Sequence, residues 1–144
     1  ITYFTMRSRS DPGAVYLDSP AARASLRPSK RRFLLKAPSE VNVSAPEALR
    51  QRSGVQVDEL IPMHDDGVAA WVVRLGPDAR ATCPAPSTGG GQNIIVIAGT
   101  LLHEGRAMDY CSCAFLYPDD AAFEAQAGAG GLELLVMQYP RSAG

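Results

Sequence analysis

Hydrophobic and polar positions form their clearest pattern at residues 88–102, TGGGQNIIVIAGTLL. Three glycines and a polar pair precede one apolar run, and Gly99 separates that run from a second one. The β-branched residues from Ile94 to Ile97 are stiff at χ1 and suit a pleated strand better than a helix. Because the run is apolar on both faces, it predicts a central strand covered on both sides, with a tight corner at Gly99.

Residues 55–140 as a whole show the same pattern of short apolar runs separated by turn residues. Short runs rich in β-branched and aromatic residues alternate with Gly, Asp and Pro turns, one of them the hairpin tip His103-Glu104-Gly105. Strands at this spacing, without βαβ units, predict an all-β sandwich or barrel. The expected strands lie at 55–63, 68–75, 92–99, on both arms of a hairpin within 101–108, and at 110–117, 122–127 and 132–139, with a long loop at 81–91 and a turn at 128–131.

The first part of the chain predicts an arm of short strands and helices. Ser19 stands before Pro20, as a capping hydroxyl stands before the first turn of a helix, and predicts a helix over 21–26. Ser44 and Glu47 have the spacing of a capping box and predict a second, mostly exposed helix. Short strands are expected at 1–5, 33–35 and 41–43.

Composition places the chain among globular domains, with 46% apolar and 20% charged residues in a length of 144. That length suits one domain with a hydrophobic core. We expect an N-terminal arm, 1–54, that packs on a barrel, 55–140, followed by a tail, 141–144. No apolar run is long enough to cross a bilayer, so no membrane partner is expected. The three cysteines do not form a disulfide framework, which favours a reducing cytoplasm.

Basic residues are concentrated between Arg23 and Lys36, where no acidic residue occurs. Such a run can contact phosphates. It lacks interleaved aromatic residues and any nucleic-acid-binding motif, so a solvated arm is the better interpretation and nucleic acid is not expected as a partner.

Four segments carry a resemblance to a known family: GVAAWVVRLGPDA, QNIIVIAGTLLHEG, LYPDDAAFEAQAG and LELLVMQYP. Gln92, six residues and Gly99 have the spacing of the first motif of the cupin superfamily, in which a Glu occupies the position of Gln92. Pro118 leads into Ala122 where the second motif has a Pro followed by a His. Residues 55–140 therefore resemble the cupins, and in particular uncharacterised bacterial cupin-like proteins, which implies a double-stranded β-helix, or jelly-roll barrel.

The metal ligands of that family are not matched. Cupin enzymes hold Fe, Mn, Ni or Zn with two His and a Glu from the first motif and a His from the second. Here the Glu position holds Gln92, the His-x-His region within 82–87 offers only Cys83, and the second His position falls near Ala122. Because imidazole and carboxylate groups hold such ions, we expect no metal and no other cofactor.

The histidines and cysteines offer few other candidates for metal-binding or reactive residues. His64 and His103 lie at predicted turn tips and are expected to be exposed and not to act as ligands. Cys111 and Cys113 share one face of a predicted strand; such a pair can bind soft metals or form a strained disulfide, but buried core thiols are the preferred interpretation. Cys83, in its Pro-rich loop, is the better candidate for reactivity.

Candidate pocket residues follow from strand alternation and the cupin resemblance. Gln92 would point into the barrel with Ile94 and Val96, and Glu124 and Gln126 would join it from the second-motif strand. Apolar walls with a few polar groups are typical of a small-molecule pocket. A solvated rim for Glu124 and Gln126 is an equally weighted alternative. The candidate ligand-binding residues are Arg74, Cys83, Gln92, Glu124 and Gln126, and no catalytic residue is proposed.

Two functional hypotheses follow. The first is a non-catalytic cupin-like protein that binds a small polar or carboxylated molecule, or an oligomeric accessory protein, expected to be a homodimer because exposed strand edges invite pairing. The alternative is an enzyme, a dioxygenase, isomerase or lyase, with an atypical metal site or none.

Overall fold

A computed structural model describes residues 18–24 and 42–141 of the chain. The chain divides into two compact units, 1–35 and 36–144, and 18–24 is the described part of the first. Helix α1 (Pro20–Ala24) lies there, and the hydroxyl of Ser19 accepts a hydrogen bond from the Ala22 amide at 3.1 Å, which confirms the predicted cap. The strands expected at 1–5 and 33–35 lie outside the described residues, as does most of the basic run.

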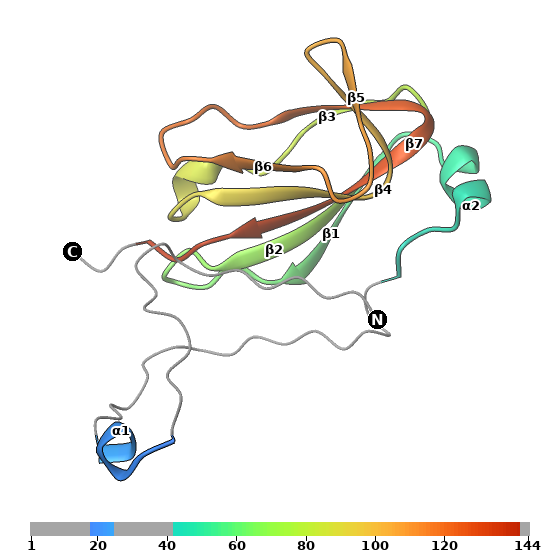
Figure 1. Cartoon of the computed structure of the whole chain (residues 1–144). Helices are drawn as coiled ribbons and strands as arrows, with labels where there is room; N and C mark the ends of the chain where they lie inside the picture. The colour runs from blue at the N-terminus through green and yellow to red at the C-terminus, as the bar shows by residue number, and fades with distance from the viewer. Residues whose placement is uncertain (1–17, 25–41, 142–144) are drawn as a thin grey trace. The chain divides into compact units, whose positions relative to one another are not determined.

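The second unit is built of antiparallel strands, and the all-β prediction is confirmed (Figure 1). A short helix and a 3-10 turn accompany them. In chain order the elements are α2 (Pro46–Gln51), β1 (Val55–Ile61), β2 (Ala69–Leu75), β3 (Arg80–Thr82), η2 (Pro86–Thr88), β4 (Gln92–His103), β5 (Arg106–Met108), β6 (Cys113–Leu116) and β7 (Glu124–Gln138).

Strands β4 and β7 are long enough to take part in both layers of the barrel (Figure 1). The first part of β4 pairs with the end of β7, in the order β1-β2-β7-β4, and β6 pairs on the other edge of β4. The start of β7 pairs with β3, and the end of β4 pairs with β5. A strand end at Gly99 and another at 128–131 were both expected, and both expectations are wrong. Strand β4 continues through Gly99 and β7 continues through 128–131, and each strand bends there.

Two glycines explain why the strands bend without ending. Gly99 has φ +72° and Gly131 has φ +83°, a region that side chains rarely adopt. A Cβ atom on Gly99 would lie 2.1 Å from the carbonyl oxygen of Gly131, and one on Gly131 would lie 2.8 Å from the Leu49 Cγ atom. The backbones of β4 and β7 therefore approach each other closely at Gly99 and Gly131. The register of the β4–β7 pairing shifts on both sides of Gly99.

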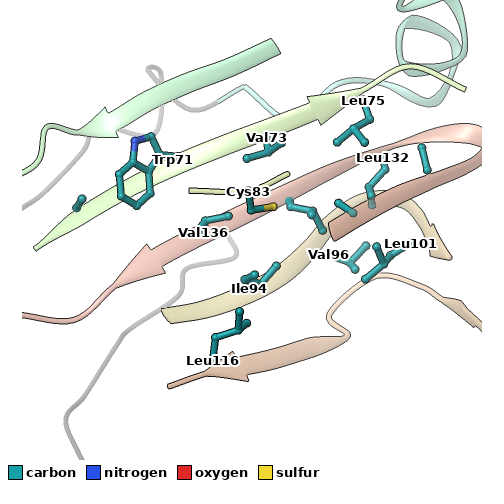
Figure 2. Packing of buried hydrophobic residues seen from close by; sticks show 14 residues of the cluster. Trp71, Val73, Leu75, Cys83, Ile94, Val96, Leu101, Leu116, Leu132 and Val136 are labelled. Carbon is teal, nitrogen blue, oxygen red and sulfur yellow. The ribbon is translucent and has the colours of Figure 1, made fainter. Parts of the chain in front are cut away.

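The inner faces of both layers form one apolar core (Figure 2). Alternate residues of the central strands point into it, as the period of two along a strand requires. The residues from Ile94 to Ile97 are all buried, which confirms β4 as a central strand. The core includes Trp71, Val73 and Leu75 of β2, Ile94 and Val96 of β4, and Leu132, Leu134 and Val136 of β7.

Helix α2 confirms one sequence prediction and corrects another. Leu49 is buried, at 2% exposure, and anchors an otherwise exposed helix, as expected. The N-cap is Ala45, without a side-chain hydrogen bond, so the predicted capping box is wrong. The Ser44 hydroxyl instead donates to Glu133 Oε1 at 2.5 Å, because a buried carboxylate needs donors more than an exposed helix end does.

The expected boundaries of arm, barrel and tail and the expected homodimer remain predictions. None of the helices in the described ranges is long and apolar enough to cross a membrane.

Candidate functional site

Gln92 lies where the sequence predicts it, on the inner face of β4, and is fully buried. Its Nε2 atom donates to the Pro84 carbonyl at 3.0 Å and to Gln138 Oε1 at 2.9 Å. Gln138 Nε2 in turn donates to the Gly67 carbonyl at 2.7 Å. Gln92 Oε1 is buried without a hydrogen-bond partner. The two amides thus cross-link loops at one end of the barrel.

Cys83 is also buried, at 3% exposure, within the apolar core (Figure 2). Burial, and after it the Glu124 carboxylate, raises the pKa of the Cys83 thiol to about 12. The thiol is therefore protonated at neutral pH, and a thiol is a weak nucleophile in that form. The expectation that Cys83 is the most reactive cysteine is wrong, because its loop folds into the core.

Arg74 does not line the barrel interior, and the predicted orientation is wrong. Trp71, Val73 and Leu75 of β2 point into the core, so strand alternation turns Arg74 to the opposite face. There its Nε atom lies 2.7 Å from Asp58 Oδ2.

Glu133 is the centre of the ion cluster to which Arg74 belongs, and its side chain is 0% exposed. It accepts hydrogen bonds from Arg74 Nη1 at 2.7 Å, from the Ser44 amide at 3.0 Å and from the Ser44 hydroxyl. Arg52 Nη2 lies 3.8 Å away. Arg74 Nη1 also donates to the Asn42 carbonyl at 2.9 Å. The cluster therefore joins the segment before α2 to β2 and β7, which is a structural role.

Glu124 and Gln126 point away from the interior as well. Ala125 and Ala127 are the buried residues of this part of β7, at 2% and 0% exposure, and belong to the core. Glu124 is exposed, and its Oε1 atom accepts a hydrogen bond from the Thr82 hydroxyl at 2.8 Å. The predicted inward orientation is wrong by one residue, and the alternative of a solvated rim describes the structure.

On that outer face the structure brings both residues into one pocket of about 320 Å³. We call it the rim pocket. It lies between β3, the start of β7 and the β4–β5 hairpin, and is lined by Arg80, Leu102, His103, Glu104, Glu124, Ala125 and Gln126. Sequence reasoning missed Arg80 and Glu104 as site residues. Arg80 lies opposite Gln126 because β3 pairs with β7, and no local pattern in the sequence predicts that pairing.

His103 is exposed, as predicted, and its ring stacks on Phe123 with centroids 5.3 Å apart. His64 is half-buried in its turn. Cys111 and Cys113 are exposed, so their expected burial in the core is wrong. Cys111 has φ +65° in the turn before β6, and that turn breaks the alternation that would have placed both thiols on one face.

The residues at the cupin ligand positions do not fit a cupin metal centre. These positions hold two residues that cannot ligate well, Gln92 and Ala122, and Cys83, whose thiol is protonated. Within 18–24 and 42–141 no group of three His, Cys, Asp or Glu side chains could hold a metal ion. No reaction step is derived through such an ion, and the sequence-based expectation of no cofactor remains a prediction.

No protein-family model matches the sequence, and no curated protein matches it. Solved structures are similar to it. An uncharacterised conserved protein with a double-stranded β-helix domain from Klebsiella pneumoniae is 14% identical over 78% of this chain and 95% of that chain, with a TM-score of 0.44. The Cupin_2 domain of an XRE family transcriptional regulator from Enterobacter cloacae is 20% identical over 60% and 98% of the two chains, with a TM-score of 0.35.

The EutQ protein of Clostridium difficile is 17% identical over 73% of this chain and 85% of that chain, with a TM-score of 0.43. In all three comparisons the sequence identity is at most 20% and the TM-score is below 0.5.

Proposed function

We propose that this cupin-like protein is a non-catalytic binding protein for a small polar molecule, which it holds in the rim pocket. The observation that carries the proposal is the gathering of Arg80, Glu124 and Gln126 around a hollow of about 320 Å³. That volume lies within the range of small-molecule sites, about 300–1,000 Å³.

The charges of the rim pocket favour a ligand that carries both signs. Arg80 is exposed, and its guanidinium makes no hydrogen bond or ion pair within the described part of the chain, so it can receive a carboxylate in bidentate fashion. Glu104 and Glu124 supply negative charge for an ammonium group, and the Gln126 amide can both donate and accept. A zwitterion such as a free amino acid matches this set.

The same pocket lacks the arrangement that covalent catalysis needs. An activated nucleophile stands within hydrogen-bond reach of a base. Cys83 is turned into the core with its pKa raised to about 12, and the His103 ring lies against Phe123. A binding role therefore accounts for these residues better than a catalytic one.

A thermal-shift screen tests the proposal. Free amino acids are compared with neutral sugars and simple monocarboxylates, each at about 10 mM. A ligand at about 100 times its Kd stabilises the folded state by about 2.7 kcal/mol, which raises the melting temperature measurably. Arg80→Ala and Gln126→Ala should abolish the shift given by zwitterions.

The matched control is Arg50→Ala, which removes an exposed arginine of α2 paired with Glu47 at 3.1 Å. It should leave the ligand-induced shift unchanged. The proposal fails if no zwitterion stabilises the protein, or if Arg80→Ala retains the full shift.

A further inference from the structure

The rim pocket opens where two neighbouring strands separate. The pairing of β4 with β7 reaches Leu101 and Ala127, and in the described part of the chain it does not continue toward the hairpin tip. The end of β4 and the start of β7 diverge from there, and the pocket of about 320 Å³ lies between them. Leu102 lines it from β4, and Glu124 and Gln126 line it from β7. The rim pocket is thus a gap between two strand edges.

The backbone of β7 offers hydrogen-bonding groups to this gap. On its other side β7 pairs with β3, where the Ala127 amide donates to the Ala79 carbonyl at 2.9 Å. The Phe123 carbonyl accepts a hydrogen bond, also at 2.9 Å, from the residue that follows β3. Hydrogen bonds to one neighbouring strand come from alternate residues of an antiparallel strand. The backbone groups of the intervening residues Glu124 and Gln126 therefore point toward β4 and the gap.

The hairpin of β4 and β5 presents its backbone from the opposite side. Its turn, Glu104-Gly105, has φ +49° and +73°, as a two-residue hairpin turn requires, and His103 pairs with Arg106 across it. The pair that flanks such a turn exchanges its hydrogen bonds, so the backbone groups of the preceding residue, Leu102, point away from β5. They face β7 across the gap.

The charged side chains of the pocket stand on opposite sides of the gap. Arg80 belongs to β3, and Glu104 to the hairpin tip. Because β3, β7 and β4 follow one another in the sheet, β3 and the hairpin are separated by two strand spacings, about 10 Å. A free amino acid carries both charges on one carbon, whereas an extended dipeptide spans about 7 Å and leaves the rest to the long arginine side chain. The separation of the charges therefore favours a peptide.

We propose that the ligand of the rim pocket is a dipeptide with both ends free, bound in extended form between β4 and β7, an inference that rests on the proposed function because it names the zwitterion that the same pocket holds. Arg80 receives the terminal carboxylate, and Glu104 faces the terminal ammonium group. The N–H and C=O of one trans peptide unit point in opposite directions, so a single unit can bond both strand edges.

The hydrogen bonds follow from these orientations. The peptide N–H donates to the Leu102 carbonyl, and the peptide carbonyl accepts from the Gln126 amide. Backbone bonds of this kind are how extended peptides add to an open sheet edge. They recognise the peptide group and not its side chains, so a simple dipeptide is a sufficient probe.

Isothermal titration calorimetry of the full chain with L-alanyl-L-alanine tests the proposal. Alanyl-alanine should bind at least about tenfold more tightly than free alanine, because it adds two hydrogen bonds to the backbone. The ester analogue alanyl-lactate has an oxygen in place of the peptide N–H. It should lose that gain, because the Leu102 carbonyl then faces an oxygen atom and has no donor.

A cycle between ligand and protein tests the position of the carboxylate. Amidation of the C-terminus of alanyl-alanine should weaken its binding to the wild-type chain by at least about tenfold, and should not weaken it further in Arg80→Ala. The matched control is Arg50→Ala, in the exposed pair with Glu47, which should bind alanyl-alanine as the wild type does. Thermal melting of the ligand-free variants shows that each is folded.

Equal affinities for alanine and alanyl-alanine would overturn the inference and leave the proposed function standing, and so would equal affinities for alanyl-alanine and alanyl-lactate. Full affinity for alanyl-alanine in Arg80→Ala would overturn the assigned orientation and with it the inference. N-acetyl-alanyl-alanine, which lacks the ammonium group, should bind more weakly; equal binding would overturn the free dipeptide in favour of the C-terminus of a longer chain. If neither alanine nor any of the dipeptides binds, the proposed function falls together with the inference.

Discussion

The buried carboxylate of Glu133 offers the sharpest test of what holds the fold together. Its side chain is 0% exposed and accepts three hydrogen bonds, at 2.7 Å from Arg74, and at 3.0 Å and 2.5 Å from the amide and hydroxyl of Ser44. Every neighbour is a donor. In Glu133→Gln the new NH₂ group must face one of these donors, and the guanidinium of Arg74 loses a buried counter-charge.

The expected cost follows from these contacts. Removing one partner of a buried ion pair destabilises a protein by about 3–5 kcal/mol, because the remaining charge stays desolvated. The Asp58 carboxylate, 2.7 Å from Arg74 Nε, still partly neutralises the guanidinium in the variant. We therefore expect the loss in free energy of unfolding to lie near the lower end of that range, at about 3 kcal/mol. With a urea slope of about 2 kcal/mol per M, the unfolding midpoint falls by about 1.5 M.

The assay is urea unfolding followed by the fluorescence of Trp71, the single tryptophan, which is 7% exposed in the core. Glu47→Gln is the matched control, because it makes the same chemical change in an exposed pair. The Glu47 side chain is 73% exposed and lies 3.1 Å from Arg50. That variant should lose at most about 1 kcal/mol.

The reasoning is refuted if Glu133→Gln costs no more than Glu47→Gln. A second comparison separates the buried charge from the lost packing. The double variant Arg74→Met/Glu133→Leu should cost less than Glu133→Leu alone, since it removes the buried guanidinium together with its buried counter-charge, and the Asp58 carboxylate that then lacks Arg74 is 34% exposed to solvent.

Two other predictions concern titration and reactivity. Hydrogen bonds from Arg74 and then Gln56 lower the pKa of Asp58 below its ordinary 3.8, so its contribution is present above that value and is lost as the pH falls through the folded pKa. Asp58→Asn should therefore flatten the fall of urea midpoints below pH 4, and parallel curves for both proteins would contradict this. With Ellman's reagent at neutral pH, Cys111 and Cys113 should react in the folded chain and Cys83 only after unfolding, because burial and Glu124 raise its pKa to about 12; a Cys83→Ala variant that loses a fast-reacting thiol would contradict that.

The candidate site was only partly accessible from the sequence. The sequence predicts Glu124 and Gln126 as pocket residues, but with the opposite orientation and without Arg80 as their neighbour. The sequence of this strand alone fits either orientation of its side chains, because a shift of one residue exchanges every inward and outward side chain. The small side chains of Ala125 and Ala127 gave no hydrophobic signal strong enough to decide it.

By itself the sequence determined the local elements: the strands near Val57, Val73 and Ile95, the hairpin tip at 103–105 and the helix anchored by Leu49. These depend on alternation, β-branching and turn residues, all of which act within a few positions of the chain. It also determined that Gln92, Cys83 and Ala122 stand at the positions where the cupin resemblance expects metal ligands, because residue identity alone decides that.

Only the tertiary structure decided that β7 continues through its glycines, that Arg74 serves a buried ion cluster, and that the serine before α2 binds Glu133 instead of capping the helix. Each of these depends on a partner far away in the chain. Side-chain direction and hydrogen-bond choice are set by what a strand packs against, and burial makes an unpaired group costly enough to override a local preference.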